Sequence, residues 1–247
     1  MGRMKMIDLH SHILPELDDG SRSLGESLEM AQVAVQSGVA AMVATPHCMD
    51  DRTRDVRWAV LLLRDALEEA GIPLRLYMGM EIFGTSETAH LLQDRKLFTL
   101  NNSRYPLIEF SFRSSGREET RILESVIRAG YRPLVAHPER YGYLQEDLGL
   151  INEWKRMGCL FQINKGSLTG RFGAAPRRLG MDLVERGFAT VVASDSHSPT
   201  VRTPWMKDVQ NLLYRQVSPA AAEYLLLHNP RSIIKNENIP PAEPEWF

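Results

Sequence analysis

The 247-residue sequence lacks the features that mark secreted, membrane and nucleic-acid-binding proteins. It has only two cysteines, Cys48 and Cys159, which are too far apart in sequence to suggest a disulfide framework. No apolar run approaches the length of a membrane span, and the opening MGRMKMIDLH lacks the apolar core of a signal peptide. The formal net charge is -2 and no basic tract occurs. We therefore expect a cytoplasmic protein with no nucleic-acid partner and no membrane insertion.

Domain linkers and nucleotide-binding turns are missing as well. No internal segment is rich in Gly, Ser or Pro, so we predict a single domain over residues 1–247. About residues 236–247, which are rich in proline, are expected to form a surface tail. The absence of a GxGxxG turn or a Walker loop after the first strand weakens the case for an open nucleotide-binding sheet.

What the chain does contain is an alternation of amphipathic helices with short apolar strands. One helix is predicted to begin at Ser23, with Glu26 in a capping box, and to end at Gly38. The strand VAAMVA follows at residues 39–44, and the same succession repeats to FATVVASD at residues 188–195. About seven strands result, and apolar strands between helices indicate a parallel sheet covered by helices. The α/β class is predicted, as either an open sheet or a barrel.

Two histidines end the first strand, in the stretch IDLHSHILP. Residues i and i+2 of a strand project to the same face, so His10 and His12 should point to one spot. Similar side chains close the other strands, and the carboxyl ends of parallel strands meet at one edge. The predicted metal ligands are His10, His12, Asp19, His47, Glu81, Glu109, His137, Asp195 and His197. His90 and His228 lie within helical patterns and are expected to serve the surface or packing.

Such a cluster of carboxylates needs positive charge if it is buried. Imidazoles and carboxylates without thiolates suit Mn, Fe, Zn or Co. Nine ligands are too many for one ion and fit two or three. Metal ions held about 3.5–4 Å apart serve in the hydrolysis of phosphate esters and amides.

The motifs DLHSHILPELDDG, TPH, GMEI, LIEF, AHPER and SDSH resemble the PHP superfamily, named for polymerase and histidinol phosphatase domains. They are most similar to its bacterial tyrosine phosphatase branch, the CpsB/CapC type of capsule and exopolysaccharide synthesis. The resemblance covers residues 6 to about 205. It implies a distorted TIM-like (β/α)7 barrel with two or three divalent metal ions, Mn first and Fe, Zn, Co or Mg as alternatives.

The resemblance also implies a role for each matched residue. One metal would be held by His10, His12, Glu81 and Asp195, a second by Glu81, Glu109 and His137, and a third by Asp19, His47 and His197. Asp18 replaces Asp19 if the register of the loop differs. Arg140 and Arg202 match phosphate-binding arginines, and guanidinium groups do pair well with phosphoryl oxygens.

The implied activity is a metal-dependent protein tyrosine phosphatase that hydrolyses phosphotyrosine by a metal-activated hydroxide. Its implied partner is the phosphotyrosine tail of a bacterial tyrosine autokinase. Two predicted loops, at residues 113–117 and 165–178, could steer such an anionic tail or could equally be ordinary solvated loops. Their cationic residues are Arg113, Arg117, Lys165, Arg171, Arg177 and Arg178. A phenyl ring could lie beside Phe112, Tyr141, Tyr143 or Phe172, although their spacing fits packing equally well.

Three alternatives stay open at this point. The superfamily includes small-molecule phosphatases, such as those that act on histidinol phosphate. The stretch HCMDDRTR has the HCx5R spacing of cysteine-dependent tyrosine phosphatases and would make Cys48 the nucleophile. Its loop has no glycine and carries Asp50 and Asp51, which disfavour both phosphate binding and a thiolate. The third alternative is a metal-binding regulatory domain without turnover.

Overall fold

The computed structural model describes residues 5–239, whose nine strand segments form two parallel sheets. The first sheet contains β1 (Met6–Ser11), β2 (Val39–Ala44) and β4 (Arg75–Met78). The second contains, in spatial order, β3 (His47–Cys48), β5 (Glu81–Phe83), β6 (Leu107–Glu109), β7 (Leu134–Ala136), β8 (Leu160–Asn164) and β9 (Val191–Ala193). Every pairing in both sheets is parallel.

The two sheets are joined into a ring. On one side β2 leads into β3, and β4 into β5, after two intervening residues each. On the other side Ser11 forms a bridge with Ser196, and the Asp195 N–H donates to the His10 carbonyl at 2.9 Å. Counting β2 with β3 and β4 with β5, the ring has seven strands, as the sequence predicts.

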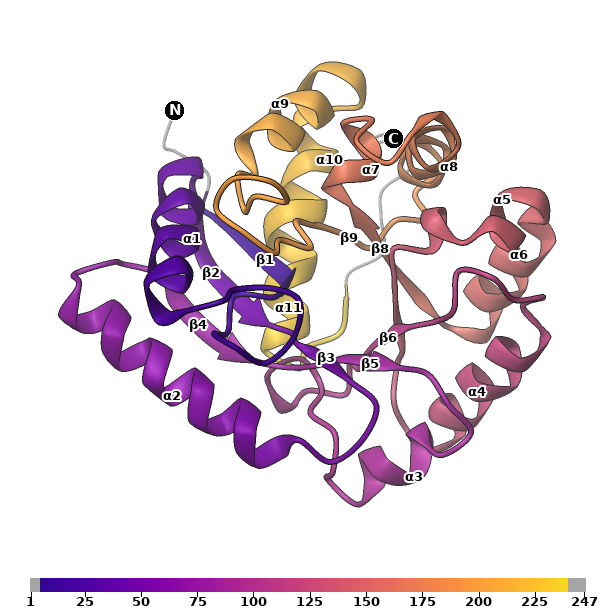
Figure 1. The fold of residues 1–247 in the computed structure, drawn as a ribbon. Helices are drawn as coiled ribbons and strands as arrows, with labels where there is room; N and C mark the ends of the chain where they lie inside the picture. Colours follow the sequence, from indigo (N-terminus) through magenta and orange to yellow (C-terminus); the bar gives the residue numbers. More distant parts are fainter. Residues whose placement is uncertain (1–4, 240–247) are drawn as a thin grey trace.

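Helices surround this ring, as Figure 1 shows. They are α1 (Leu24–Ser37), α2 (Thr53–Glu69), α3 (Thr88–Gln93), α4 (Arg117–Arg128), α5 (Gly142–Glu146), α6 (Leu148–Met157), α7 (Lys165–Leu168), α8 (Ala174–Glu185) and α9 (Lys207–Gln216). Short 3₁₀ turns occur at η1 (Leu100–Asn102) and η2 (Pro138–Arg140). The chain then continues through α10 (Pro219–Glu223), the π-helical η3 (Tyr224–His228) and α11 (Asn229–Ile234).

The alternation of side chains along the strands divides the core into two layers. Ile7, Leu107 and Leu134 point into the ring, where they meet Ile233 of α11. Their neighbours, such as Ile108, pack outward against the helices in the larger cluster. Because α11 contacts the beginnings of the strands, it closes the amino-terminal end of the barrel and leaves the carboxyl-terminal end to the polar side chains.

The predicted caps of helix α1 form only in part. The Ser23 hydroxyl accepts from the Glu26 N–H at 3.2 Å, and Gly38 ends the helix with a φ of 103°. The Glu26 carboxylate, however, accepts from the Arg22 N–H at 2.8 Å and not from Ser23, so only half of the predicted capping box forms.

The described part of the predicted surface tail is mostly exposed but makes hydrogen bonds to the rest of the chain. Residues 240–247 of the predicted tail lie outside the described residues, but residues 236–239 are fastened to the barrel. The Tyr105 hydroxyl donates to the Glu237 carbonyl at 2.7 Å, and Arg104 donates to the Asn238 side chain at 2.6 Å. The segment 165–178, expected to be a loop, contains α7 and the start of α8.

Candidate metal centre

His10 and His12 converge as the strand pattern predicts, with their Nε2 atoms 3.2 Å apart. Strand β1 has one residue more than β2 between the pairs Asp8–Met42 and Ser11–Ala44, so it contains a bulge. Leu9 faces the ring, and the bulge lets the next residue, His10, face it too, since its Nδ1 lies 2.9 Å from the Gln162 side chain of β8.

The second nitrogen of each imidazole is fixed by a partner. An amide oxygen and a carboxylate can only accept, so Nδ1 of His10 donates to Gln162, and Nδ1 of His12 donates to Asp18 at 2.7 Å. In the neutral imidazoles both Nε2 atoms then carry a lone pair, and they face each other at 3.2 Å. Two lone pairs at this distance repel each other unless a cation lies between them.

Glu81 lies at the middle of the cluster and is buried. Its Oε2 is 3.2 Å from His10 Nε2, 3.3 Å from His12 Nε2 and 3.0 Å from His47 Nδ1. Its Oε1 is 2.9 Å from His137 Nε2. Burial raises the pKa of Glu81, but the surrounding imidazoles outweigh this and hold it well below the usual range. The carboxylate is therefore charged and faces four imidazoles.

Three further carboxylates, at the edges of the cluster, also lie close to imidazole nitrogens. Asp195 Oδ1 is 3.5 Å from His10 and 3.4 Å from His12. Glu109 is 3.6 Å from His137 and 3.5 Å from His47. Asp19, His47 and His197 form the outermost group, in which Asp19 Oδ1 is 3.5 Å from His47 and 3.4 Å from His197.

The structure separates the roles of the two adjacent aspartates. The Asp18 carboxylate is taken up by His12 and by the backbone N–H groups of Gly20 and His47, at 2.9 and 3.0 Å. Burial raises its pKa, but these hydrogen bonds lower it to about 2. The Asp19 side chain is instead free to face His47 and His197. The geometry thus favours Asp19 as the ligand and Asp18 as the group that orients His12.

All nine predicted ligands lie in four overlapping groups that could hold metal ions. These groups are His12, Asp19, His47 and His197; His10, His12 and Asp195; His10, Glu81 and His137; and His47, Glu81 and Glu109. Two atoms bound to one ion at about 2.1 Å lie about 3.0–3.4 Å apart, which matches the separations above. The buried Glu81 Oε2 has no hydrogen-bond partner among the described residues. The donor set therefore fits several divalent cations.

In the absence of cations, protons must supply part of the missing positive charge. Burial lowers the pKa of His10, but Glu81 and Asp195 raise it above its usual value. The pKa of His197 is instead lowered to about 4 by its burial and by the neighbouring His12. Metal binding would then displace protons from the inner histidines.

Two of the predicted ligands have an unusual backbone conformation. His137 has a φ of 32° and Asp195 a φ of 50°, both in the left-handed region that residues with a side chain seldom adopt. Such conformations are retained where the surrounding structure imposes them, and they gather at functional sites. His137 follows directly on β7, and Asp195 follows β9 after one residue, both at the end where the cluster lies.

Arg140 and Arg202 reach the cluster from two loops. Arg202 Nη2 pairs with Asp195 Oδ2, and its Nη1 lies 3.0 Å from His197 Nε2. Arg140 Nη1 lies 3.4 Å from the same Asp195 oxygen. Phe172 packs against both guanidinium groups, with ring-to-guanidinium distances of 4.3 Å for Arg140 and 5.9 Å for Arg202.

The four predicted aromatic residues divide into two kinds. Tyr141 is fully buried and its hydroxyl donates to the Ala136 carbonyl at 2.8 Å, while Tyr143 stacks on it. Both therefore serve packing. Phe112 is 41% exposed, and its ring lies 4.8 Å from the Arg140 guanidinium. Phe112 and Phe172 are thus placed where a substrate ring could approach.

The predicted steering by cations needs one correction. Lys165 is buried, and its ammonium group donates to the Trp205 carbonyl at 2.5 Å and lies 3.4 Å from Asp208. It therefore ties the Arg202 loop to α7 and α9 and does not face an incoming ligand. Arg171, in contrast, is exposed.

Two polar residues of β8 were missed in the sequence. Gln162 accepts from His10, and Asn164 donates to Asp195 Oδ2 at 2.5 Å. The signal was present, since Gln and Asn alternate with apolar residues in LFQIN. The two side chains orient ligands, and nothing in their chemistry marks them as ligands themselves.

Cys48 does not occupy a phosphate-binding loop. It is buried in β3, its thiol donates to the Asp50 carbonyl at 2.9 Å, and burial raises its pKa. Arg54, the arginine of the HCx5R spacing, lies in α2. A thiolate nucleophile requires the opposite environment.

Replacing Cys48 by serine should therefore leave the predicted phosphatase activity within about twofold of the unchanged protein, since the buried thiol is not placed to act as a nucleophile. The rate of p-nitrophenyl phosphate hydrolysis by Cys48→Ser checks this. The rate of the unchanged protein before and after iodoacetamide treatment is a second check. Cys159→Ser is the control for the other buried thiol. Complete loss of turnover in a folded Cys48→Ser variant would restore the cysteine mechanism.

Comparisons with known proteins agree with this geometry. A family model described as "Capsular polysaccharide synthesis, CpsB/CapC" matches residues 6–235. The tyrosine-protein phosphatase YwqE of Bacillus subtilis is 34% identical over 238 residues, which are 95% of this chain and 93% of that protein. The tyrosine-protein phosphatase CpsB of Streptococcus pneumoniae is 32% identical over 243 residues, covering 95% of this chain and all of that protein (100%).

Solved structures show the fold directly. A structure described among those of YwqE and CpsB, "unique metal-dependent tyrosine phosphatases", superposes with a TM-score of 0.90 at 33% identity, over 97% of this chain and 98% of the other. An organophosphorus hydrolase of Deinococcus radiodurans shares the fold alone, with a TM-score of 0.58 at 12% identity and coverage of 94% and 93%. These likenesses confirm the predicted α/β barrel class. Within residues 5–239, no helix is long and apolar enough to cross a membrane.

Proposed function

Because this chain belongs to the CpsB/CapC family, we propose that it is a metal-dependent protein tyrosine phosphatase. The observation that carries the proposal is the convergence of nine imidazole and carboxylate side chains, with two arginines beside them, at the carboxyl-terminal end of the barrel. A phosphomonoester needs both parts of this site. Cations and guanidinium groups neutralise its oxygens, and an activated water attacks its phosphorus.

In this proposal the ligand set holds two or three ions, with manganese as our first choice. The inner ion would be held by His10, His12, Glu81 and Asp195, the second by Glu81, Glu109 and His137, and the outer by Asp19, His47 and His197. Oxygen and imidazole ligands without thiolate suit manganese and leave iron, zinc, cobalt and magnesium as alternatives. Bound ions of this kind lower the pKa of water enough to make hydroxide available near neutral pH.

The arginines bind the phosphoryl group in this proposal. Arg140 and Arg202 both pair with Asp195 Oδ2, so their guanidinium groups converge on one point at the edge of the cluster. A phosphate there would accept hydrogen bonds from both groups. Phe172, packed against both, restricts their orientations and so reduces the entropy lost on binding.

Hydrolysis of phosphotyrosine needs little help from a general acid. Tyrosinate is a good leaving group because the pKa of tyrosine is about 10, well below that of an alkyl alcohol. The exposed ring of Phe112 stands next to Arg140, where the phenyl ring of a phosphotyrosine would lie. The alcohol of an alkyl phosphate such as histidinol phosphate would have to leave as an alkoxide, which is a poorer leaving group, and it has no phenyl ring to lie beside Phe112.

We further propose that the substrate is the phosphotyrosine tail of a bacterial tyrosine autokinase, met in the cytoplasm during capsule or exopolysaccharide synthesis. The support is the family, whose model is described by capsular polysaccharide synthesis. A flexible tail would suit a centre at the rim of a barrel. Exposed arginines near the rim, Arg113, Arg117, Arg171, Arg177 and Arg178, would attract its phosphates.

Metal removal tests the function most simply. Dialysis against a chelator should abolish hydrolysis of a phosphotyrosine peptide, and added Mn²⁺ should restore most of it. We expect the peptide to exceed histidinol phosphate in kcat/KM by at least about tenfold, given the better leaving group. Steady-state rates on both substrates check this. Equal rates after chelation would contradict metal dependence, and a preference for histidinol phosphate would favour the small-molecule phosphatase.

A further inference from the structure

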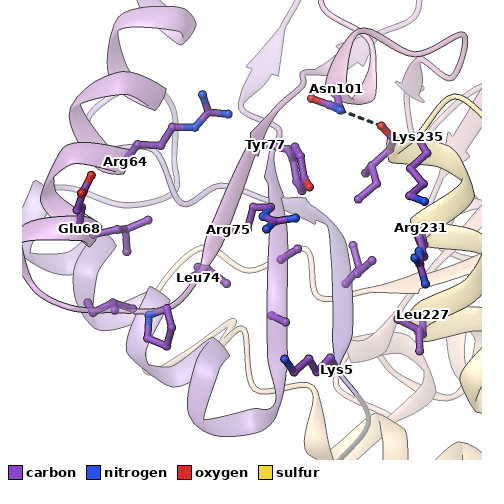
Figure 2. A pocket seen from close by; sticks show the side chains of 17 residues that line it. Lys5, Arg64, Glu68, Leu74, Arg75, Tyr77, Asn101, Leu227, Arg231 and Lys235 are labelled. Atoms are coloured by element: carbon purple, nitrogen blue, oxygen red, sulfur yellow. Dashed lines mark hydrogen bonds between the residues drawn. The ribbon is translucent and has the colours of Figure 1, made fainter.

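A hollow lies at the amino-terminal end of the barrel, opposite the metal centre, and the proposed function does not use it. It has a volume of about 850 Å³ and is bordered by α2, β4 and α11. Figure 2 shows Arg75 of β4 between Arg64 of α2 on one side and Arg231 of α11 on the other. The strands β1, β2 and β4 each have residues that line the hollow, and each runs from there toward the metal centre. On β1, for example, Ile7 lines the hollow and His10 lies in the centre.

The charge of this hollow is strongly positive. Its lining contains five cationic side chains and one carboxylate, a net charge of +4, although the whole chain has a net charge of -2. The cations are Lys5, Arg64, Arg75, Arg231 and Lys235. A concave surface focuses the field of such a group and raises the local concentration of anions.

Few of these cations are neutralised by the protein. Within the described part of the chain, only Lys235 has a carboxylate within 4.0 Å, that of Glu237 at 3.7 Å. Arg64 donates to the Leu76 carbonyl at 2.7 Å, which holds its guanidinium beside β4. A bound anion would supply the counter-charge that these side chains lack.

The hollow also has apolar walls, which a small inorganic ion would not need. Its apolar residues include Leu67 of α2, Ile72 and Leu74 just before β4, Leu227 of η3 and Ile234 of α11. Tyr77 of β4 also lines the hollow, and its ring is partly exposed and able to pack against a flat ring. Ligand sites generally combine apolar walls with a few polar groups, in volumes of about 300–1,000 Å³.

From these features we infer that the hollow binds an organic phosphate of the nucleoside diphosphate class. Arg75, Arg231 and Lys235 would hold the phosphates, and the apolar walls with Tyr77 would hold the organic part. A guanidinium pairs with phosphate oxygens through two parallel hydrogen bonds, and a diphosphate carries more negative charge than a lone carboxylate, which suits a lining with a net charge of +4. The inference does not depend on the phosphatase activity, because none of these residues lies in the metal centre.

Calorimetric titration of the metal-loaded protein with ADP tests the inference. We expect saturable binding with a Kd below about 1 mM. Arg75→Glu and Arg231→Glu should each weaken it at least about tenfold, because each replaces a charge-assisted hydrogen bond with repulsion. Arg121→Glu, on the exposed face of α4, is the matched control and should bind ADP normally. Circular dichroism verifies that each variant is folded.

Two further titrations separate this hollow from other sources of binding. Arg140→Ala, which alters the metal centre, should leave ADP affinity unchanged, and loss of binding there would place ADP at that centre. Pyrophosphate and adenosine should each bind more weakly than ADP, since each has only half of the required chemistry. Pyrophosphate binding as tight as that of ADP, normal binding by both glutamate variants, or no saturation near 1 mM would overturn the inference.

Discussion

Replacing Glu81 by alanine is expected to lower kcat/KM for a phosphotyrosine peptide by at least about 10³-fold and to reduce bound metal. Glu81 lies within 3.3 Å of four imidazoles, and in the proposed grouping it would serve two of the ions. Metal ions stabilise the charge of a transition state by several kcal/mol, and about 4 kcal/mol corresponds to 10³-fold. Kinetics and elemental analysis on the same preparation measure both effects.

Controls decide whether this loss comes from the site or from unfolding. Glu81→Gln keeps the shape of the side chain and removes its charge, so it should also lose activity and metal while its thermal unfolding stays cooperative. Glu153→Ala, at an exposed position of α6, should change neither quantity. A folded Glu81→Ala variant that kept both its metal and its turnover would show that Glu81 is not a ligand.

Replacing Arg202 by alanine should lower kcat/KM by about 10²–10³-fold while metal content stays near that of the unchanged protein. Removing one preorganised hydrogen-bond donor to a developing oxyanion usually costs this much. Arg140→Ala should behave alike. Arg202→Lys should recover only part of the loss, because an ammonium group cannot form two parallel hydrogen bonds to phosphate. Steady-state kinetics and elemental analysis again provide the readouts.

The arginine prediction has a specific point of failure. Arg202 contacts Asp195 and His197, so its removal could act through these ligands. If Arg202→Ala and Arg140→Ala lost metal in proportion to activity, the division between arginines that bind phosphate and residues that bind metal would be wrong. Arg215→Ala, at an exposed position of α9, is the control for the loss of a surface arginine.

The convergence of the nine predicted ligands could be expected from the sequence because strand ends constrain side chains strongly. His10 and His12 had to share a direction once the first strand was assigned, and their Nε2 atoms are 3.2 Å apart. The other ligands follow from parallel strands, whose carboxyl ends meet at one edge. The resemblance supplied the grouping by ion, which no spacing in the sequence contains.

Other features depended on tertiary contacts that local patterns do not encode. Helix α11 closes the barrel through Ile233 and Ile234, and no repeat in the sequence indicates that these residues face the strands. The bulge in β1 is fixed by its pairing with β2. Lys165 looked like a solvated loop residue, but the fold buries it against the Trp205 carbonyl. The HCx5R spacing failed for the same reason, since its cysteine lies in a buried strand.

Metal occupancy tests the central claim most directly. A crystal of the protein grown with Mn²⁺, measured with X-rays at the manganese absorption edge, should give two or three strong anomalous peaks. The peaks should lie between His10, His47, Glu81 and His137, at distances of about 2.0–2.3 Å from their ligand atoms. Data showing no peak among these residues, with the protein fully active, would contradict the account.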